Sequence, residues 1–158
     1  MIDTISPATV WRLLPEILLM LWATAIYVLG AFLPARRVWN AIAIIGLAVV
    51  AFVVAQQQSA LAEASDLPLV SGPAIFDSLT MATRSLVLGL GLLFLLMSGR
   101  SISAGLSAEY AGSLLLILAG LMLVAAAGDL VLLFLGLELV SIPTYIVLYL
   151  GRDDFRCQ

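Results

Sequence analysis

Hydrophobic residues occur in long unbroken runs along the chain, and the rare charged and turn-forming residues fall between the runs. A helix that crosses the roughly 30 Å hydrocarbon layer of a membrane needs about 20 mostly apolar residues. The runs are continuous instead of alternating between apolar and polar positions, which disfavours a β-barrel. The pattern predicts an all-α, polytopic membrane protein with transmembrane helices at about residues 13–33, 38–55, 79–98, 110–127 and 130–150.

The segments between these runs predict how the helices are connected. Residues 56–78 begin with three glutamines and contain acidic residues, prolines and a glycine, so they predict the one substantial loop. Only Gly128 and Asp129 separate the last two runs, and such a tight turn predicts an antiparallel helical hairpin. We therefore divide the chain into three N-terminal helices (1–108), a helix pair (109–152) and a tail (153–158).

Composition supports a lipid environment and excludes several kinds of function. Hydrophobic residues make up 63% of the chain and charged residues 11%, against about 45–50% and 25% in soluble domains. The net charge of −3 and the lack of a basic stripe argue against binding to nucleic acid. With Cys157 as the single cysteine and no histidine, neither an internal disulfide nor a Cys/His metal site is expected. The first run is too long for a secretory signal peptide.

The arginines predict how the chain is oriented, because they accumulate in cytoplasmic loops close to the membrane. An external N-terminus places the loop around Glu63 and Asp66 outside, with Arg12 and Arg84 on the same side. We expect Arg84, near the start of the third helix, to extend its guanidinium to the interface. The arginines on the cytoplasmic side, together with the C-terminal tail, are then Arg36, Arg37, Arg100, Arg152 and Arg156.

Glu138 is the strongest candidate for a functional side chain. It lies about eight residues into the fifth apolar run, hence roughly 12 Å deep and near the middle of the bilayer. An acidic residue at that depth costs about 2.5–3.5 kcal/mol to insert, and such groups commonly mark routes for ions or protons. Glu138 is therefore predicted to be a proton relay. The alternative is a protonated acid that serves only as a hydrogen-bond donor between helices.

Polar residues near Glu138 support this interpretation. At 100° per residue, Ser141, Tyr145 and Tyr149 share one side of the helix with Glu138. Pro143 removes a backbone N–H and is expected to leave a carbonyl oxygen without a helical partner. The sequence thus predicts a hydrated site around Glu138, supported by Ser141, Pro143 and Tyr145. Two other acidic residues, Glu109 and Asp129, fall at the ends of predicted helices and are expected to be anchors.

The segment from Glu109-Tyr110 to Asp129-Leu130, followed by Glu138-Leu-Val-Ser141-Ile-Pro143-Thr-Tyr145, resembles subunit N of bacterial NADH-quinone oxidoreductase. The family is that of the antiporter-like membrane subunits of respiratory complex I. The resemblance covers about residues 105–152, and the first three helices share only layout and hydropathy with it. It implies a larger antiporter-like bundle in which the glutamate that Glu138 matches pairs with a lysine on a later helix.

The resemblance also implies a function for the chain as part of an enzyme. A proton-translocating subunit couples electron transfer from NADH to a quinone such as ubiquinone with proton pumping in the cell inner (plasma) membrane. NADH, FMN, iron–sulfur clusters and quinone are expected in other subunits and no cofactor in this chain, while other membrane subunits are the expected partners. The chain contains no lysine and its tail departs from the family, so we expect a truncated or frameshifted product, inactive alone.

Two other functions stay open on the sequence alone. A cation/proton antiporter or a membrane-bound hydrogenase has large subunits with a similar helix pair. A small structural or assembly protein of the membrane would pack against a larger complex without conducting protons. Replacement of Glu138 by glutamine distinguishes a structural or assembly protein from a proton carrier, because proton pumping by the complex would be unchanged if the protein were only structural.

Overall fold

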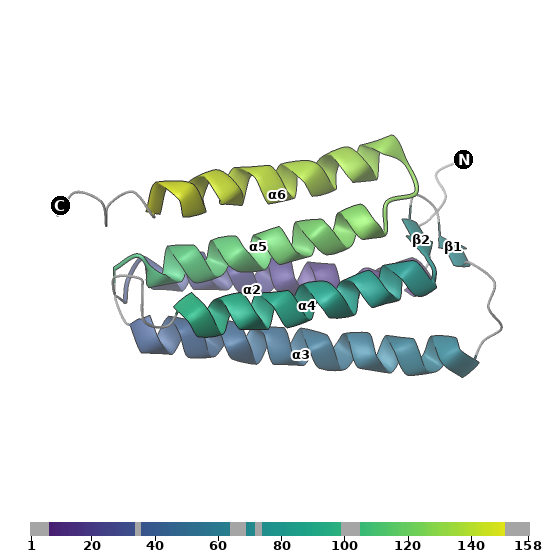
Figure 1. Ribbon diagram of the computed structural model, residues 1–158, viewed down its shortest axis with the longest axis horizontal. Coiled ribbons are helices and arrows are strands. Elements are labelled where there is room, and N and C mark those ends of the chain that lie inside the picture. The colour runs from purple at the N-terminus through teal and green to yellow at the C-terminus, as the bar shows by residue number, and fades with distance from the viewer. Residues whose placement is uncertain (1–6, 34–35, 64–68, 72–73, 99–104, 151–158) are drawn as a thin grey trace.

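The computed structural model describes residues 7–33, 36–63, 69–71, 74–98 and 105–150, which form a bundle of long helices with a two-stranded hairpin at one end (Figure 1). The helices are α1 (Pro7–Arg12), α2 (Leu14–Gly30), α3 (Arg36–Glu63), α4 (Ser78–Ser98), α5 (Ser107–Ala125) and α6 (Leu130–Leu150). The antiparallel hairpin consists of β1 (Leu69–Ser71) and β2 (Ala74–Phe76), with Val70 opposite Ile75. We call the end of the bundle that carries it the hairpin end.

The long helices make the chain a helical membrane protein. In the described ranges, four helices are long and apolar enough to cross a membrane, namely α3, α4, α5 and α6. The first predicted span is shorter than expected, because α2 has 17 residues and ends at Gly30. Pro15 lies in the first turn of α2, where its missing N–H has no helical partner to lose. The orientation of the bundle in the membrane stays a prediction.

The segment between the second and third predicted spans differs most from expectation. The glutamines at 56–58 do not end the second helix, and α3 continues to Glu63. Helix propensity explains this, since glutamine and alanine both favour helix and no glycine or proline follows before Pro68. The predicted loop then forms the β1–β2 hairpin instead of irregular structure throughout. Residues 64–68 and 72–73 lie outside the described ranges.

Helix α5 lies at the centre of the bundle and α6 at its edge (Figure 1). Helices α2, α3, α4 and α6 all pack against α5, whereas α6 packs mainly against α5. The predicted hairpin of the last two helices is therefore present, with a turn between Ala125 and Leu130. Gly120 and Gly136 let these two backbones approach closely: a Cβ added at Gly120 would lie 2.9 Å from the Gly136 carbonyl oxygen.

The β-hairpin is joined to the turn between α5 and α6. The Ile75 N–H donates to the Ala126 carbonyl oxygen at 2.9 Å, and Ala74 forms an isolated antiparallel bridge with Ala127. Thr80, at the start of α4, places its hydroxyl 3.2 Å from the Ala125 carbonyl oxygen. Segments far apart in the sequence are thus held together at the hairpin end by hydrogen bonds from the backbone of Ile75 and the hydroxyl of Thr80 to carbonyl oxygens of the turn between α5 and α6.

Candidate functional site

Glu138 lies in the middle of α6, eight residues after Leu130, as the sequence predicts. Its side chain is exposed on the surface of the bundle. Neighbouring large side chains on the same helix are exposed as well, with Leu137 50% and Tyr145 71% accessible. Within the described residues, no hydrogen bond or ion pair involves the Glu138 carboxyl group. A carboxyl group so placed would face lipid unless protein outside this part of the chain covers it.

The residues predicted to support Glu138 do not all gather around it. Tyr145 and Tyr149 are exposed like Glu138, and we call these three side chains the α6 outer face. The Ser141 hydroxyl donates to the Leu137 carbonyl oxygen of its own helix at 2.8 Å. Pro143 is buried, five residues from Glu138 and therefore on a different side of the helix. Helix α6 continues through Pro143 to Leu150.

A second group of charged residues is buried at the hairpin end. Arg84 Nη2 lies 2.5 Å from Glu16 Oε1, and the two side chains are 0% and 1% exposed. The second Arg84 nitrogen, Nη1, donates to Gln57 Oε1 at 3.2 Å. Gln57 is itself held by a hydrogen bond from its Nε2 to the Trp11 carbonyl oxygen at 2.7 Å. Glu16, Gln57 and Arg84 thus bring α2, α3 and α4 together in one network.

Phe76 of β2 completes this network, and we call Glu16, Gln57, Phe76 and Arg84 the hairpin-end cluster. The Arg84 guanidinium carbon lies 5.0 Å from the centroid of the Phe76 ring, a cation–π distance. Arg84 Nη2 also donates to the Arg12 carbonyl oxygen at 3.1 Å. Two polar atoms of the cluster, Glu16 Oε2 and Arg84 Nε, have no hydrogen-bond partner among the described residues. The hairpin therefore shields an ion pair from the outside.

The expectation that Arg84 extends to the membrane interface is wrong. Its guanidinium is fully buried because Glu16 supplies an opposite charge, while Gln57 and the Arg12 carbonyl oxygen accept hydrogen bonds from Nη1 and Nη2. The sequence carried a signal for this pair. Consecutive antiparallel helices bring the starts of the first and third spans to the same end of a bundle, and each start holds one charge of opposite sign. Whether these two charges meet depends on how each helix is rotated about its axis, and the positions of the charges in the sequence do not determine that rotation.

Two aspartates fix the starts of α4 and α6 in the same way. Asp77 Oδ1 accepts a hydrogen bond from the Thr80 N–H at 2.7 Å, and Asp129 Oδ1 accepts one from the Leu132 N–H at 2.7 Å. Both are N-caps, in which a carboxylate satisfies a free N–H of the first turn. Hydrogen bonds from the backbone and hydroxyl of Thr80 lower the pKa of the Asp77 carboxyl group. Asp129 thus lies at a helix end as expected, and its role as a membrane anchor stays a prediction.

The hairpin-end cluster and Glu138 are separate sites. The cluster joins α2, α3, α4 and β2, while Glu138 lies halfway along the edge helix α6. Among the described residues, no three acidic or cysteine side chains lie close enough to hold a metal ion. Chemically, the cluster is a closed ion pair, whereas the α6 outer face offers a carboxyl group and phenol hydroxyls to a neighbour.

No family model, no curated protein and no solved structure matches the chain. The resemblance to the antiporter-like subunits accordingly rests on the residues from Glu109 to Arg152 alone.

Proposed function

We propose that this chain contributes a proton-relay helix to a membrane translocase of the antiporter-like class, in the manner of subunit N of NADH-quinone oxidoreductase. Glu138 would bind a proton from one side of the membrane as a neutral acid and release it towards the other side. Electron transfer would take place in other subunits. The single observation that carries the proposal is the unpaired carboxyl group of Glu138 on the exposed face of α6, in the middle of the helix.

The energetic argument concerns what must cover this carboxyl group. Insertion of an acidic residue at a helix centre costs about 2.5–3.5 kcal/mol, and such residues usually face protein or water instead of lipid. Within the described residues the hydrogen-bonding capacity of Glu138 is unused. A neighbouring helix that supplies a cation or a water-filled path would satisfy it. A carboxyl group in contact with such a neighbour can change its protonation when the neighbour moves, which is what a relay requires.

The structure of the helix pair supports the same proposal. Helix α6 is anchored along one side to α5 through the Gly120–Gly136 approach, so its opposite side stays available to further helices. Tyr145 and Tyr149 extend the polar character of that side along the next turns. The α6 outer face is therefore suited to packing against protein that carries complementary polar groups.

The test is proton pumping in membrane vesicles of the source cells, with Glu138→Gln in the chromosomal copy. We expect NADH-driven acidification to fall by at least about tenfold, since removal of an acid–base group typically costs about 10²–10⁴-fold. Glu109→Gln is the matched control, because Glu109 is also exposed but lies in the first turn of α5. Equal acidification in the two variants, at equal amounts of chain in the membrane, would favour a non-conducting structural protein.

A further inference from the structure

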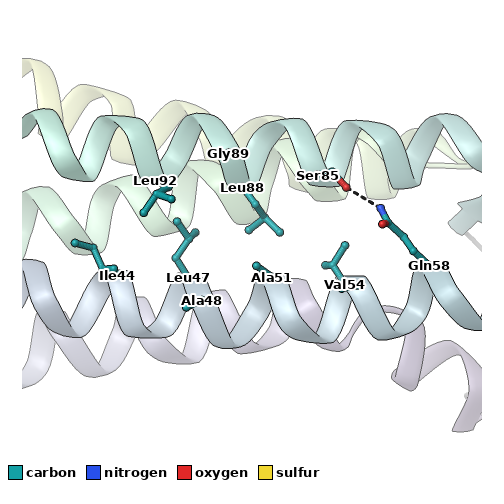
Figure 2. A pocket seen from close by; sticks show the side chains of 11 residues that line it. Ile44, Leu47, Ala48, Ala51, Val54, Gln58, Ser85, Leu88, Gly89 and Leu92 are labelled. Carbon is teal, nitrogen blue, oxygen red and sulfur yellow. Dashed lines mark hydrogen bonds between the residues drawn. The ribbon is translucent and has the colours of Figure 1, made fainter.

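A groove with a volume of about 420 Å³ runs along the outside of the bundle between α3 and α4 (Figure 2). Its walls are hollowed by small residues, Ala48, Ala51 and Ala55 on α3 and Gly89 on α4. At the hairpin end, Gln58 Nε2 donates to Ser85 Oγ at 2.6 Å, and this hydrogen bond spans the two helices (Figure 2). Apart from this pair the lining is apolar, and none of the lining residues is charged.

Gly89 shows that the hollow is real open space. A Cβ atom added to this residue would meet no atom within 4 Å. By contrast, a Cβ at Gly91, two residues further along α4, would lie 2.3 Å from the Leu118 side chain. The side of α4 that faces the bundle is therefore closely packed, and the side that faces the groove is open. In a bilayer, such a space on the outer surface is filled by hydrocarbon and not by water.

The shape of the groove suits a thin ligand. From Ile44 to Gln58 it follows α3 for about 21 Å. A hydrocarbon chain, with carbon contacts at about 3.5–4.0 Å, is only about 4–5 Å across, whereas a helix is about 10–12 Å across. An extended acyl chain is therefore narrow enough to lie along the groove beside its small residues.

A positive charge beyond the Ile44 end of the groove indicates which kind of molecule would supply the hydrocarbon chain. Arg37 is exposed in the first turn of α3, seven residues before Ile44. At 100° per residue, seven residues return to within about 20° of the same direction, so Arg37 lies in line with the groove. Among the described residues, no acidic side chain forms an ion pair with Arg37. A cation about 10 Å beyond an apolar groove matches a phosphate group joined through glycerol to an acyl chain.

We propose that the groove between α3 and α4 binds one acyl chain of a glycerophospholipid of the surrounding bilayer, with the lipid phosphate at Arg37. The site does not depend on whether Glu138 carries protons. Two contacts define it: apolar packing along Ile44 to Ala55, and a charge-assisted hydrogen bond from the Arg37 guanidinium to the phosphate. The bound lipid would fill the space beside Gly89.

The experiment uses the full chain in nanodiscs that contain phosphatidylglycerol with a photoreactive diazirine in its acyl chain. After irradiation, mass spectrometry of peptides locates the adducts. We expect them to concentrate on Ala48, Ala51 and Gly89 over Phe52 and Leu90, which are 64% and 47% exposed. Gly89→Leu fills the groove and should abolish the groove adducts. Gly105→Leu is the matched control, because a Cβ there also meets nothing within 4 Å.

The phosphate contact is tested separately. Arg37→Gln should lower the groove adducts of the phospholipid about fivefold at limiting probe, the effect of one arginine near an anionic headgroup. A diacylglycerol with the same diazirine but no phosphate should label the groove weakly in both proteins. Equal labelling by the two probes, or no effect of Arg37→Gln, would overturn the phosphate assignment in favour of another hydrocarbon ligand such as a quinone tail.

Two further outcomes would overturn the acyl site itself. Adducts spread evenly over groove and outer residues, and unchanged in Gly89→Leu, would mean ordinary contact with bulk lipid. Crosslinks from the groove to a second polypeptide would mean that protein covers it. Size-exclusion chromatography and circular dichroism check that the variants fold, and Ala51→Phe serves as a second groove-filling change. The Arg37→Gln comparison stands without either filled variant.

Discussion

Glu16 and Glu138 are both carboxyl groups in apolar helices, and their surroundings are opposite. Glu16 is 1% exposed and its charge is matched by Arg84 inside the hairpin-end cluster. Glu138 is exposed on the α6 outer face, where no described residue bonds to it. Both would cost free energy in a hydrocarbon environment without a partner. The bundle therefore supplies a charged partner for the carboxyl group of Glu16. The carboxyl group of Glu138 would need a partner from outside the described residues.

This contrast separates a structural from a functional use of charge. An ion pair that is closed on every side holds helices together, and a change in its protonation would disturb the fold. A carboxyl group at the edge of a bundle can interact with a neighbour and change protonation without breaking internal contacts. The four predictions that follow test whether stability depends on the hairpin-end cluster and not on the α6 outer face.

The largest effect is expected for Arg84→Met. Removing one member of a buried pair leaves Glu16 as an uncompensated charge, which typically costs about 3–5 kcal/mol. Reversible unfolding in mixed micelles, followed by circular dichroism, measures the change in the free energy of unfolding. Arg37→Met is the control, since Arg37 is exposed. The double variant Glu16→Gln/Arg84→Met should recover part of the loss, and a loss below about 1 kcal/mol for Arg84→Met would mean the pair is not buried as described.

A smaller effect is expected at the N-caps. Asp77→Ala should cost about 1–2 kcal/mol of unfolding free energy, because the N–H of Thr80 loses its acceptor. Asp129→Ala removes the same kind of cap at α6 and should cost about 0.5–1 kcal/mol. The difference is expected because the Thr80 hydroxyl also reaches Asp77 Oδ1 at 2.8 Å, at the hairpin end. The same unfolding assay compares the two variants, and a larger cost at Asp129 would reverse the comparison.

The Asp77 cap should also make stability depend on pH. Its pKa in the folded protein is lowered by hydrogen bonds from the backbone and hydroxyl of Thr80. A carboxyl group with a lowered pKa stabilises the fold fully above its ordinary pKa of about 3.9, and this contribution is lost as pH falls through the folded value. Asp77→Asn keeps a capping oxygen but does not titrate. The wild-type chain should lose stability relative to this variant on acidification below pH 4, and parallel pH curves would exclude the cap as the cause.

The smallest effect on stability is expected for Glu138→Gln. Because no described residue bonds to this carboxyl group, its replacement should change the free energy of unfolding of the isolated chain by no more than about 0.5 kcal/mol. Glu16→Gln is the paired variant and should be much more destabilising. If both glutamine variants lost the same stability in the unfolding assay, the contrast between the two carboxyl groups would not hold.

Much of the helical layout could be predicted from the scarcity of charge. The starts or ends of α4, α5 and α6 fall within a few residues of the predicted spans, because charges and glycines interrupt the apolar runs there. The end of α3 could not be predicted in this way, since three glutamines are polar enough to suggest a loop and yet favour helix. Polarity and helix propensity are different properties. The polarity of the side chains decides where the membrane-spanning part of a helix ends, but the helix itself can continue beyond that point.

The position of Glu138 along its helix was predictable, but the direction in which its side chain points was not. Counting residues places Glu138 in the middle of α6, and the structure agrees. Which side of α6 faces the bundle depends on the Gly120–Gly136 approach, and apolar residues surround the helix on all sides, so no hydrophobic stripe indicates it. Arg84 shows the same difficulty. Its position in the sequence suggested that Arg84 reaches the membrane interface. Its contact with Glu16, 68 residues earlier, depends instead on how α2 and α4 pack.

The hydrogen bond between Ile75 and Ala126 constrains the order in which the chain assembles during synthesis. The acceptor lies 51 residues after the donor, so at about 5–20 residues per second the ribosome needs roughly 3–10 s to supply it. Within that interval α4 is completed after α2 and α3, so these three helices can form the Glu16–Arg84 pair, which needs nothing later than Arg84. The docking of β2 must wait for the turn between α5 and α6. The hairpin end is therefore completed only when the turn before α6 has been made, and the order of synthesis allows the early helices to pair before the helix that carries Glu138 is added.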